Sequence, residues 1–192
     1  KQQAVPVGKG AMAALLGVNF EVAEKIAAAA AQGDICQIAN DNDPAQVVLS
    51  GDKSAIDRIA EIGKAHGVRR AIPLPVSAPF HCELMQPAAD AMADALSKVE
   101  INAPCVPVVA NVLAEAIRDP DEIAKRLVEQ VTGRVRWRES VLYMTENGIT
   151  DIYEIGTGKV LAGLVRRTAR QLKSASIDLP EDIAAHASVV CG

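Results

Sequence analysis

The sequence predicts an α/β protein, and several observations support this fold class. Short apolar runs alternate along the chain with segments whose apolar residues recur at helical spacing. The connections between these segments are short and contain Gly, Asn, Asp and Pro. Of the 192 residues, 49% are hydrophobic and 23% are charged, which is an ordinary balance for a globular protein. Strands that alternate with helices across short turns indicate a layered α/β core.

Residues 8–75 are predicted to form a small subdomain with the element order βαββαβ. Its strands are expected at residues 11–16, 35–39, 47–49 and 70–74. Asn19 and Asp52 are expected to cap its two helices, each of which is followed by a glycine. The stretch 40–44, Asn-Asp-Asn-Asp-Pro, has the composition of a turn. This order of elements is that of a ferredoxin-like fold.

Residues 76–192 are predicted to form a second α/β domain. Helices are expected at residues 84–96, 120–130, 137–147 and 159–172, and strands at 105–112 and 152–155. The run 105–112 is almost continuously apolar, as a parallel strand buried on both faces would be. Because two strands make a poor sheet, this half is expected to need sheet partners that the chain does not supply.

Charge and composition argue against several classes of partner. The formal net charge is −4, so no nucleic-acid partner is expected, because a phosphate backbone binds a concentrated basic face. Most of the clustered arginines fit a solvated helix face; they are Arg134, Arg136, Arg138, Arg166, Arg167 and Arg170. The cysteines lack CxxC spacing, which predicts neither a metal site nor a disulfide scaffold; they are Cys36, Cys82, Cys105 and Cys191. With no signal peptide and no apolar run of about 18 residues, a cytoplasmic protein without a membrane partner is expected.

His81 is the first candidate for a catalytic residue. It stands in Pro79-Phe80-His81-Cys82, where a loop enters a predicted helix. The positive end of a helix dipole disfavours protonation of the ring, and a neutral imidazole can serve as a general base. The alternative is a half-buried histidine whose hydrogen bonds are satisfied within the fold. The residues alone leave both interpretations open.

Six segments, in register along nearly the whole chain, resemble the malonyl-CoA:acyl-carrier-protein transacylase family. SAPFHCELM, which contains His81, resembles its histidine motif, and AVPVGKGAMAALLG resembles the entry to its small subdomain. NDNDPAQVVLSG resembles its Asn-rich turn, and VPVVANV, LVEQVTGRVRW and YEIGTGKVLAGL resemble successive core segments. The resemblance implies an α/β-hydrolase-like acyltransferase core with a ferredoxin-like subdomain.

The resemblance also implies an activity and the residues that carry it. The family transfers a malonyl group from CoA to the phosphopantetheine thiol of acyl carrier protein in fatty acid synthesis, by a Ser/His ping-pong mechanism without a cofactor. His81 is implied to be the base and then the acid, oriented by the main-chain carbonyl of Gln130 rather than by an aspartate. Phe80 matches the malonyl-selective form of the motif. Asn40 and Asn42 are candidates to face a bound CoA or phosphopantetheine arm, although turn chemistry accounts for them equally well.

The family's nucleophile motif has no match in this sequence. No serine stands in GxSxG, and neither the Gln-containing oxyanion loop nor the arginine that binds the malonyl carboxylate is found. The chain has no initiator Met and opens like the middle of a longer protein. It is therefore expected to be the C-terminal portion of such an enzyme, inactive without the missing N-terminal segment.

Rival interpretations remain open at this stage. One is an acyltransferase domain cut from a polyketide synthase, and another is a non-catalytic module that binds a ligand or a protein. An RNA-binding module would need exposed aromatic residues or a basic face, and Phe20 is the only aromatic residue in residues 8–75. A third is a truncated reading frame, since the tail 187–192 resembles nothing in the family. Gly156-Thr-Gly-Lys159 lacks the length and the Ser/Thr of a phosphate-binding loop, so a tight turn is expected there.

Overall fold

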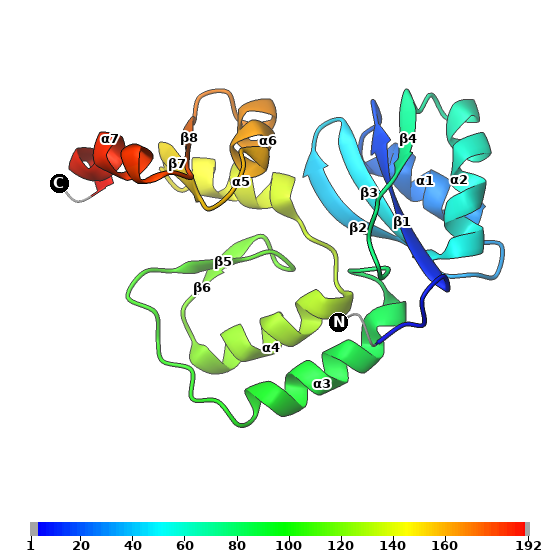
Figure 1. Cartoon of the computed structure of the whole chain (residues 1–192), viewed down its shortest axis with the longest axis horizontal. Coiled ribbons are helices and arrows are strands. Elements are labelled where there is room, and N and C mark those ends of the chain that lie inside the picture. Colours follow the sequence, from blue (N-terminus) through cyan, green and yellow to red (C-terminus); the bar gives the residue numbers. More distant parts are fainter. Residues whose placement is uncertain (1–3, 191–192) are drawn as a thin grey trace. The chain divides into compact units, whose positions relative to one another are not determined.

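The computed structural model describes residues 4–190 (Figure 1). Residues 1–140 and 141–192 form two compact units, and the domain boundary expected after residue 75 stays a prediction. Cys191 and the end of the tail 187–192 lie outside the described residues. No helix within residues 4–190 is long and apolar enough to cross a bilayer.

The first unit begins with a four-stranded sheet and two helices. The strands lie in the order β2-β3-β1-β4, and every neighbouring pair is antiparallel (Figure 1). This arrangement confirms the predicted βαββαβ order and its ferredoxin-like topology. The elements are β1 (Gly10–Leu16), α1 (Phe20–Ala31), β2 (Cys36–Asp43), β3 (Gln46–Asp52), α2 (Lys53–Ala65) and β4 (Arg70–Pro73).

Alternation along β1 supplies apolar side chains to both faces of this sheet. Ala13 and Leu15 pack in the cluster that includes the buried faces of α1 and α2. Met12 and Ala14 point to the other face, where they belong to a second cluster. Phe80 packs against that second cluster, so the residue before His81 is fixed to the sheet.

The two helix caps of the sheet subdomain differ from each other. The Asn19 side chain accepts a hydrogen bond from the Val22 amide at 3.1 Å, as predicted for the start of α1. Asp52 stands at the N-cap of α2 but makes no side-chain capping bond. Its carboxylate accepts instead from the Ile35 amide at 2.9 Å, so the expected capping role is wrong. Asp52 therefore ties the end of β3 to the start of β2.

The prediction of a turn at residues 40–44 is wrong. β2 continues through Asp43, with irregular pairing to β3 after Ile38 and after Asp41, and the turn is confined to Pro44 and Ala45. Asn40 and Asn42 are therefore strand residues. This polar segment can form a strand because the buried Asp41 side chain is paired with an arginine that is distant in the sequence. The local composition does not reveal that partner.

The rest of the first unit is mainly helical. Its two long helices, α3 and α4, pack side by side (Figure 1). Their shared cluster includes Met85, Ala89 and Val131, with Phe80 packed against it. The elements are a 3-10 turn η1 (Glu83–Met85), α3 (Gln86–Leu96), β5 (Val108–Ala110), β6 (Glu115–Ile117), α4 (Pro120–Thr132) and the start of α5 (Trp137–Glu146).

The prediction of a buried parallel strand at residues 105–112 is also wrong for this chain. Only Val108–Ala110 is a strand, and its partner among the described residues is β6, which runs antiparallel to it. Val106 is 64% exposed and Val108 is 42% exposed. An apolar run of this kind is buried only when neighbouring strands cover it, and β6 alone does not.

The second unit contains a parallel strand pair joined by a helix. β7 (Asp151–Ile155) pairs in parallel with β8 (Lys173–Ile177), and α6 (Val160–Thr168) connects them. The predicted strand 152–155 is confirmed, whereas the predicted helix 159–172 ends four residues early. β8 and α7 (Pro180–Val190) were not predicted, because the Ser- and Ala-rich β8 lacks the β-branched composition of a strand.

Glycine is required at position 51 because two segments of the backbone approach each other closely there. A Cβ at this position in β3 would lie 1.9 Å from the Ile35 carbonyl oxygen, which is main chain and cannot move aside alone. We expect Gly51→Ala to lower the free energy of unfolding by about 2 kcal/mol, measured by urea titration followed through Trp137 fluorescence. In α6, where Arg167 Nη1 is the nearest atom at 3.6 Å, Gly163→Ala is the control and should be neutral or stabilising. Equal effects of the two substitutions would contradict the close contact.

Candidate active site

His81 lies in a tightly held loop between β4 and η1. Its backbone has φ 60°, a left-handed conformation that is unusual for a residue other than glycine. Pro79 is buried so close to β1 that a Cβ on Gly10 would lie 2.3 Å from its Cγ. The Cys82 thiol, also buried, donates to the Pro79 carbonyl at 3.2 Å. Such strained backbone persists only where the surrounding contacts hold it.

The His81 ring contacts the carboxyl-terminal end of α4. Its Nδ1 lies 2.9 Å from the main-chain carbonyl oxygen of Gln130. That carbonyl belongs to the last turn of the helix, where carbonyl groups lack a partner within the helix. The structure thus brings together the histidine and the carbonyl that the family resemblance singled out. Their catalytic roles remain a proposal.

The carbonyl acceptor determines which ring nitrogen carries the proton. Because a carbonyl oxygen only accepts, the 2.9 Å contact requires a hydrogen on Nδ1. The Gln130 side-chain amide also lies 3.4 Å from Nδ1, but it donates to the Gly133 carbonyl at the shorter distance of 2.9 Å. In the neutral ring the lone pair is then on Nε2. This is the nitrogen that can take a proton from a hydroxyl group.

Cys82 does not offer a rival nucleophile beside His81. Burial raises the pKa of its thiol, because the thiolate would be poorly solvated there. The thiol therefore stays protonated at neutral pH. Among the described residues, no group of three or more His, Cys, Asp or Glu side chains is placed to bind a metal ion.

The other predicted site residues occupy different positions. The Phe80 ring is half-buried and packs between the sheet and the α3–α4 cluster, which is a structural contact. Asn40 forms an isolated parallel bridge with Val135, just beyond α4. Asn40 and Asn42 are both half-buried within β2. A contact of any of these three residues with substrate stays a prediction.

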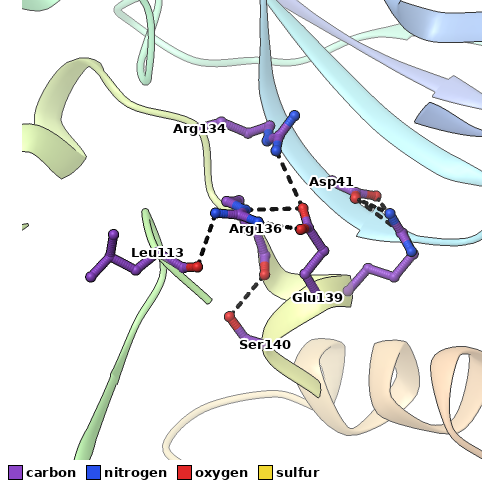
Figure 2. Close-up of polar contacts among 7 residues, drawn as sticks. Asp41, Leu113, Arg134, Arg136, Glu139 and Ser140 are labelled. Carbon is purple, nitrogen blue, oxygen red and sulfur yellow. Dashed lines mark hydrogen bonds and ion pairs between the residues drawn. The ribbon is translucent and has the colours of Figure 1, made fainter. Parts of the chain in front are cut away.

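An ion-pair network joins β2 to the segment after α4, and the sequence analysis missed it. Arg138 Nη2 lies 2.8 Å from Asp41 Oδ2, and the Asp41 side chain is only 1% exposed. Figure 2 labels Asp41 and Glu139, and Glu139 bonds both Arg134 and Arg136. Of the six clustered arginines, most of which were expected on a solvated helix face, Arg166, Arg167 and Arg170 are exposed, whereas Arg134, Arg136 and Arg138 are partly buried in ion pairs. The alternation of Arg134, Arg136 and Arg138 was the available signal.

The electrostatics of the network are consistent with stable ion pairs. The hydrogen bond to Asp41 raises the pKa of Arg138, and the hydrogen bond from Arg136 lowers the pKa of Glu139. Main-chain bonds accompany the ion pairs, since the Val135 amide donates to the Ala39 carbonyl at 2.8 Å and the Asp41 amide donates to the Val135 carbonyl at 2.9 Å. Residues 135–138 are thus attached to β2 by both backbone and side chains.

Known proteins resemble this chain in both sequence and structure. It is 45% identical over 184 residues to "Malonyl CoA-acyl carrier protein transacylase" of Escherichia coli (strain K12), a match that covers 96% of this chain and 60% of that protein. The protein of the same name from Bacillus subtilis (strain 168) is 41% identical over 182 residues, covering 94% of this chain and 57% of its own length. The chain thus spans about 60% of the length of these curated relatives. No model of a protein family matches it.

Solved structures give the same result. The crystal structure of acyl-carrier-protein-S-malonyltransferase from Bartonella henselae superposes with a TM-score of 0.95 at 46% identity, covering 100% of this chain and 61% of that one. A second structure is a type II PKS acyl-carrier protein in complex with its malonyl-transacylase. It has a TM-score of 0.92 at 41% identity and covers 97% of this chain and 61% of the other.

Proposed function

The chain belongs to the malonyl CoA-acyl carrier protein transacylase family, and on this premise we propose that it acts in malonyl transfer from CoA to acyl carrier protein. The acceptor is the phosphopantetheine thiol of the carrier, and the transfer serves fatty acid synthesis. The observation that carries the proposal is the 2.9 Å contact between His81 Nδ1 and the Gln130 carbonyl, because it presents Nε2 as the base. The cytoplasmic location that the sequence analysis expects stays a prediction.

In the proposed mechanism His81 serves as base and then as acid in each half-reaction. Nε2 takes the proton of a serine hydroxyl while the serine oxygen bonds to the malonyl carbonyl carbon. The C–S bond of the thioester then breaks, and the imidazolium returns its proton to the departing CoA sulfur. In the second half-reaction Nε2 takes the proton of the carrier thiol while its sulfur bonds to the malonyl carbonyl carbon. The bond to the serine oxygen then breaks, and the imidazolium returns the proton to that oxygen. The partial negative charge at the carboxyl end of α4 stabilises the imidazolium during transfer.

The nucleophilic serine is proposed to come from polypeptide outside these 192 residues. No serine of this chain stands in GxSxG, and the relatives are longer than the part that the chain matches. A second candidate function is the same transfer to the carrier of a type II polyketide synthase. One similar solved structure, at 41% identity, is such a carrier protein in complex with its malonyl-transacylase. The two candidates differ in the acceptor and share the chemistry.

A reconstitution experiment tests the proposal. The part of the Escherichia coli relative that this chain does not match is produced as a separate polypeptide and mixed with the 192-residue chain. Association is verified by gel filtration, and transfer of radiolabelled malonyl from CoA to holo acyl carrier protein is then measured. We expect transfer with both polypeptides and only background with either one alone. An associated complex without transfer to a fatty-acid or a polyketide carrier would contradict the proposal.

A further inference from the structure

Gln37 in β2 contacts the residue that lies two positions after His81. Its Nε2 donates to Glu83 Oε1 at 2.7 Å, and its Oε1 accepts from the Glu83 amide at 2.8 Å. The two residues are 46 positions apart in the sequence, so this reciprocal pair joins the sheet to the histidine loop. The oxygen and the nitrogen of the Gln37 side-chain amide thus each have a partner in Glu83.

This pair provides a cap for the helical segment that follows His81. Cys82 is the N-cap of η1 but makes no side-chain capping bond. The first main-chain amides of a helical segment lack partners within the segment, and the amide of Glu83 is one of these amides. Gln37 Oε1 satisfies that amide from a neighbouring strand. The strand thereby substitutes for a local cap and fixes where the turn after His81 begins.

The same strand also holds the other partner of the His81 hydrogen bond. Val135, five residues after Gln130, bonds to Ala39 and Asp41 of β2 through its main chain. The link from Gln130 to Val135 is tight, because a Cβ on Gly133 would lie 2.7 Å from the Glu129 carbonyl oxygen. β2 therefore holds both partners of the hydrogen bond in place. Gln37 binds the loop that carries the His81 ring, and Ala39 and Asp41 bind the segment that follows the Gln130 carbonyl.

We propose that Gln37 is a positioning residue for His81, and that β2 sets the separation between the His81 ring and the Gln130 carbonyl. The strained backbone of His81 would relax once one of its anchors is removed, and the ring would turn away from the carbonyl. The effect on catalysis rests on the proposed function. The effect on the ring does not, and it can be observed in the 192-residue chain itself.

The variants of Gln37 distinguish the effect of its two hydrogen bonds from the effects of side-chain charge and side-chain size. Gln37→Met keeps the length of the side chain and removes both bonds. Gln37→Glu places a carboxylate against Glu83. The exchange Gln37→Glu with Glu83→Gln restores one side-chain donor and one acceptor with their places reversed, and the carboxylate at position 37 can still accept from the main-chain amide of residue 83. Gln86→Met is the matched control, since it removes an exposed amide bond to Asp90 at 2.8 Å on the same stretch of chain. Circular dichroism verifies that each variant is folded.

The primary readout is the ring N–H signal of His81 in a 15N-labelled chain, assigned with His81→Ala. We expect a slowly exchanging Nδ1–H in the unmodified chain and in Gln86→Met. The signal should be lost in Gln37→Met and Gln37→Glu, and it should return in the exchanged pair. Retention of the protected signal in both single Gln37 variants would overturn the inference, as would a failure of the exchanged pair to restore it.

Kinetics of the reconstituted enzyme supply the second readout. A positioning defect should lower kcat by roughly 10- to 100-fold in Gln37→Met with little change in KM for malonyl-CoA, because the base is misplaced while the substrate still binds. A change in KM alone would contradict positioning. If the unmodified complex is inactive, the proposed function fails while the ring signal still decides the role of Gln37.

Discussion

Replacing His81 by alanine is expected to reduce malonyl transfer by the reconstituted enzyme by at least about 10³-fold. Without the imidazole nothing in the loop takes the serine proton, and the neighbouring Cys82 thiol has a pKa raised by burial. Both half-reactions need the same ring, so neither acylation nor transfer to the carrier should proceed. The measurement is single-turnover formation of the malonyl-serine intermediate, followed by its discharge to holo carrier protein.

An exposed histidine supplies the control for this substitution. His66 is exposed at the C-cap of α2, and His66→Ala should leave both half-reactions unchanged. The His81 side chain is only half-buried and does not belong to the clusters of buried apolar side chains, so the fold should persist in His81→Ala. A His81→Ala complex that retains a tenth of the normal rate would exclude the ring as the base.

The sequence was sufficient for the features whose causes are local. Asn19 caps α1 because an asparagine before an apolar stripe can bond the free amides of the first turn. The ferredoxin-like order followed from such caps and stripes taken in sequence. The pairing of His81 with the Gln130 carbonyl came from the family resemblance, since no spacing rule relates residues 49 positions apart.

The features that were mispredicted depend on partners that a local pattern does not contain. Asp41 has the polarity of a turn residue, yet it continues β2 because its carboxylate is paired with Arg138, 97 residues later. Residues 105–112 have the apolar composition of a central strand, but their exposure is decided by which strands lie beside them. The contact of Gln37 was not predicted because its partner, Glu83, is 46 positions away in the sequence and becomes a neighbour only in the folded chain.

The buried ion pair predicts the largest effect on stability. Asp41→Leu should lower the free energy of unfolding of the first unit by about 3 kcal/mol, because Arg138 would keep a charge that is only 26% exposed and lose its partner. The attachment of residues 135–138 to β2 would then rest on the main-chain bonds of Val135 to Ala39 and Asp41. Urea titration followed through Trp137, the neighbour of Arg138 in sequence, measures the loss.

The comparison with an exposed pair tests whether burial causes this effect. Lys53 and Asp57 also form an ion pair, at 2.5 Å, but their side chains are 55% and 60% exposed, so Asp57→Ala should change stability by about 0.5 kcal/mol or less. In the double variant Asp41→Leu with Arg138→Leu, no charge is left unpaired, and much of the loss should be recovered. If Asp41→Leu costs no more than Asp57→Ala, the contact between β2 and residues 135–138 does not depend on the ion pair. If the double variant is as unstable as the single one, the unpaired Arg138 charge is not the cause of the loss.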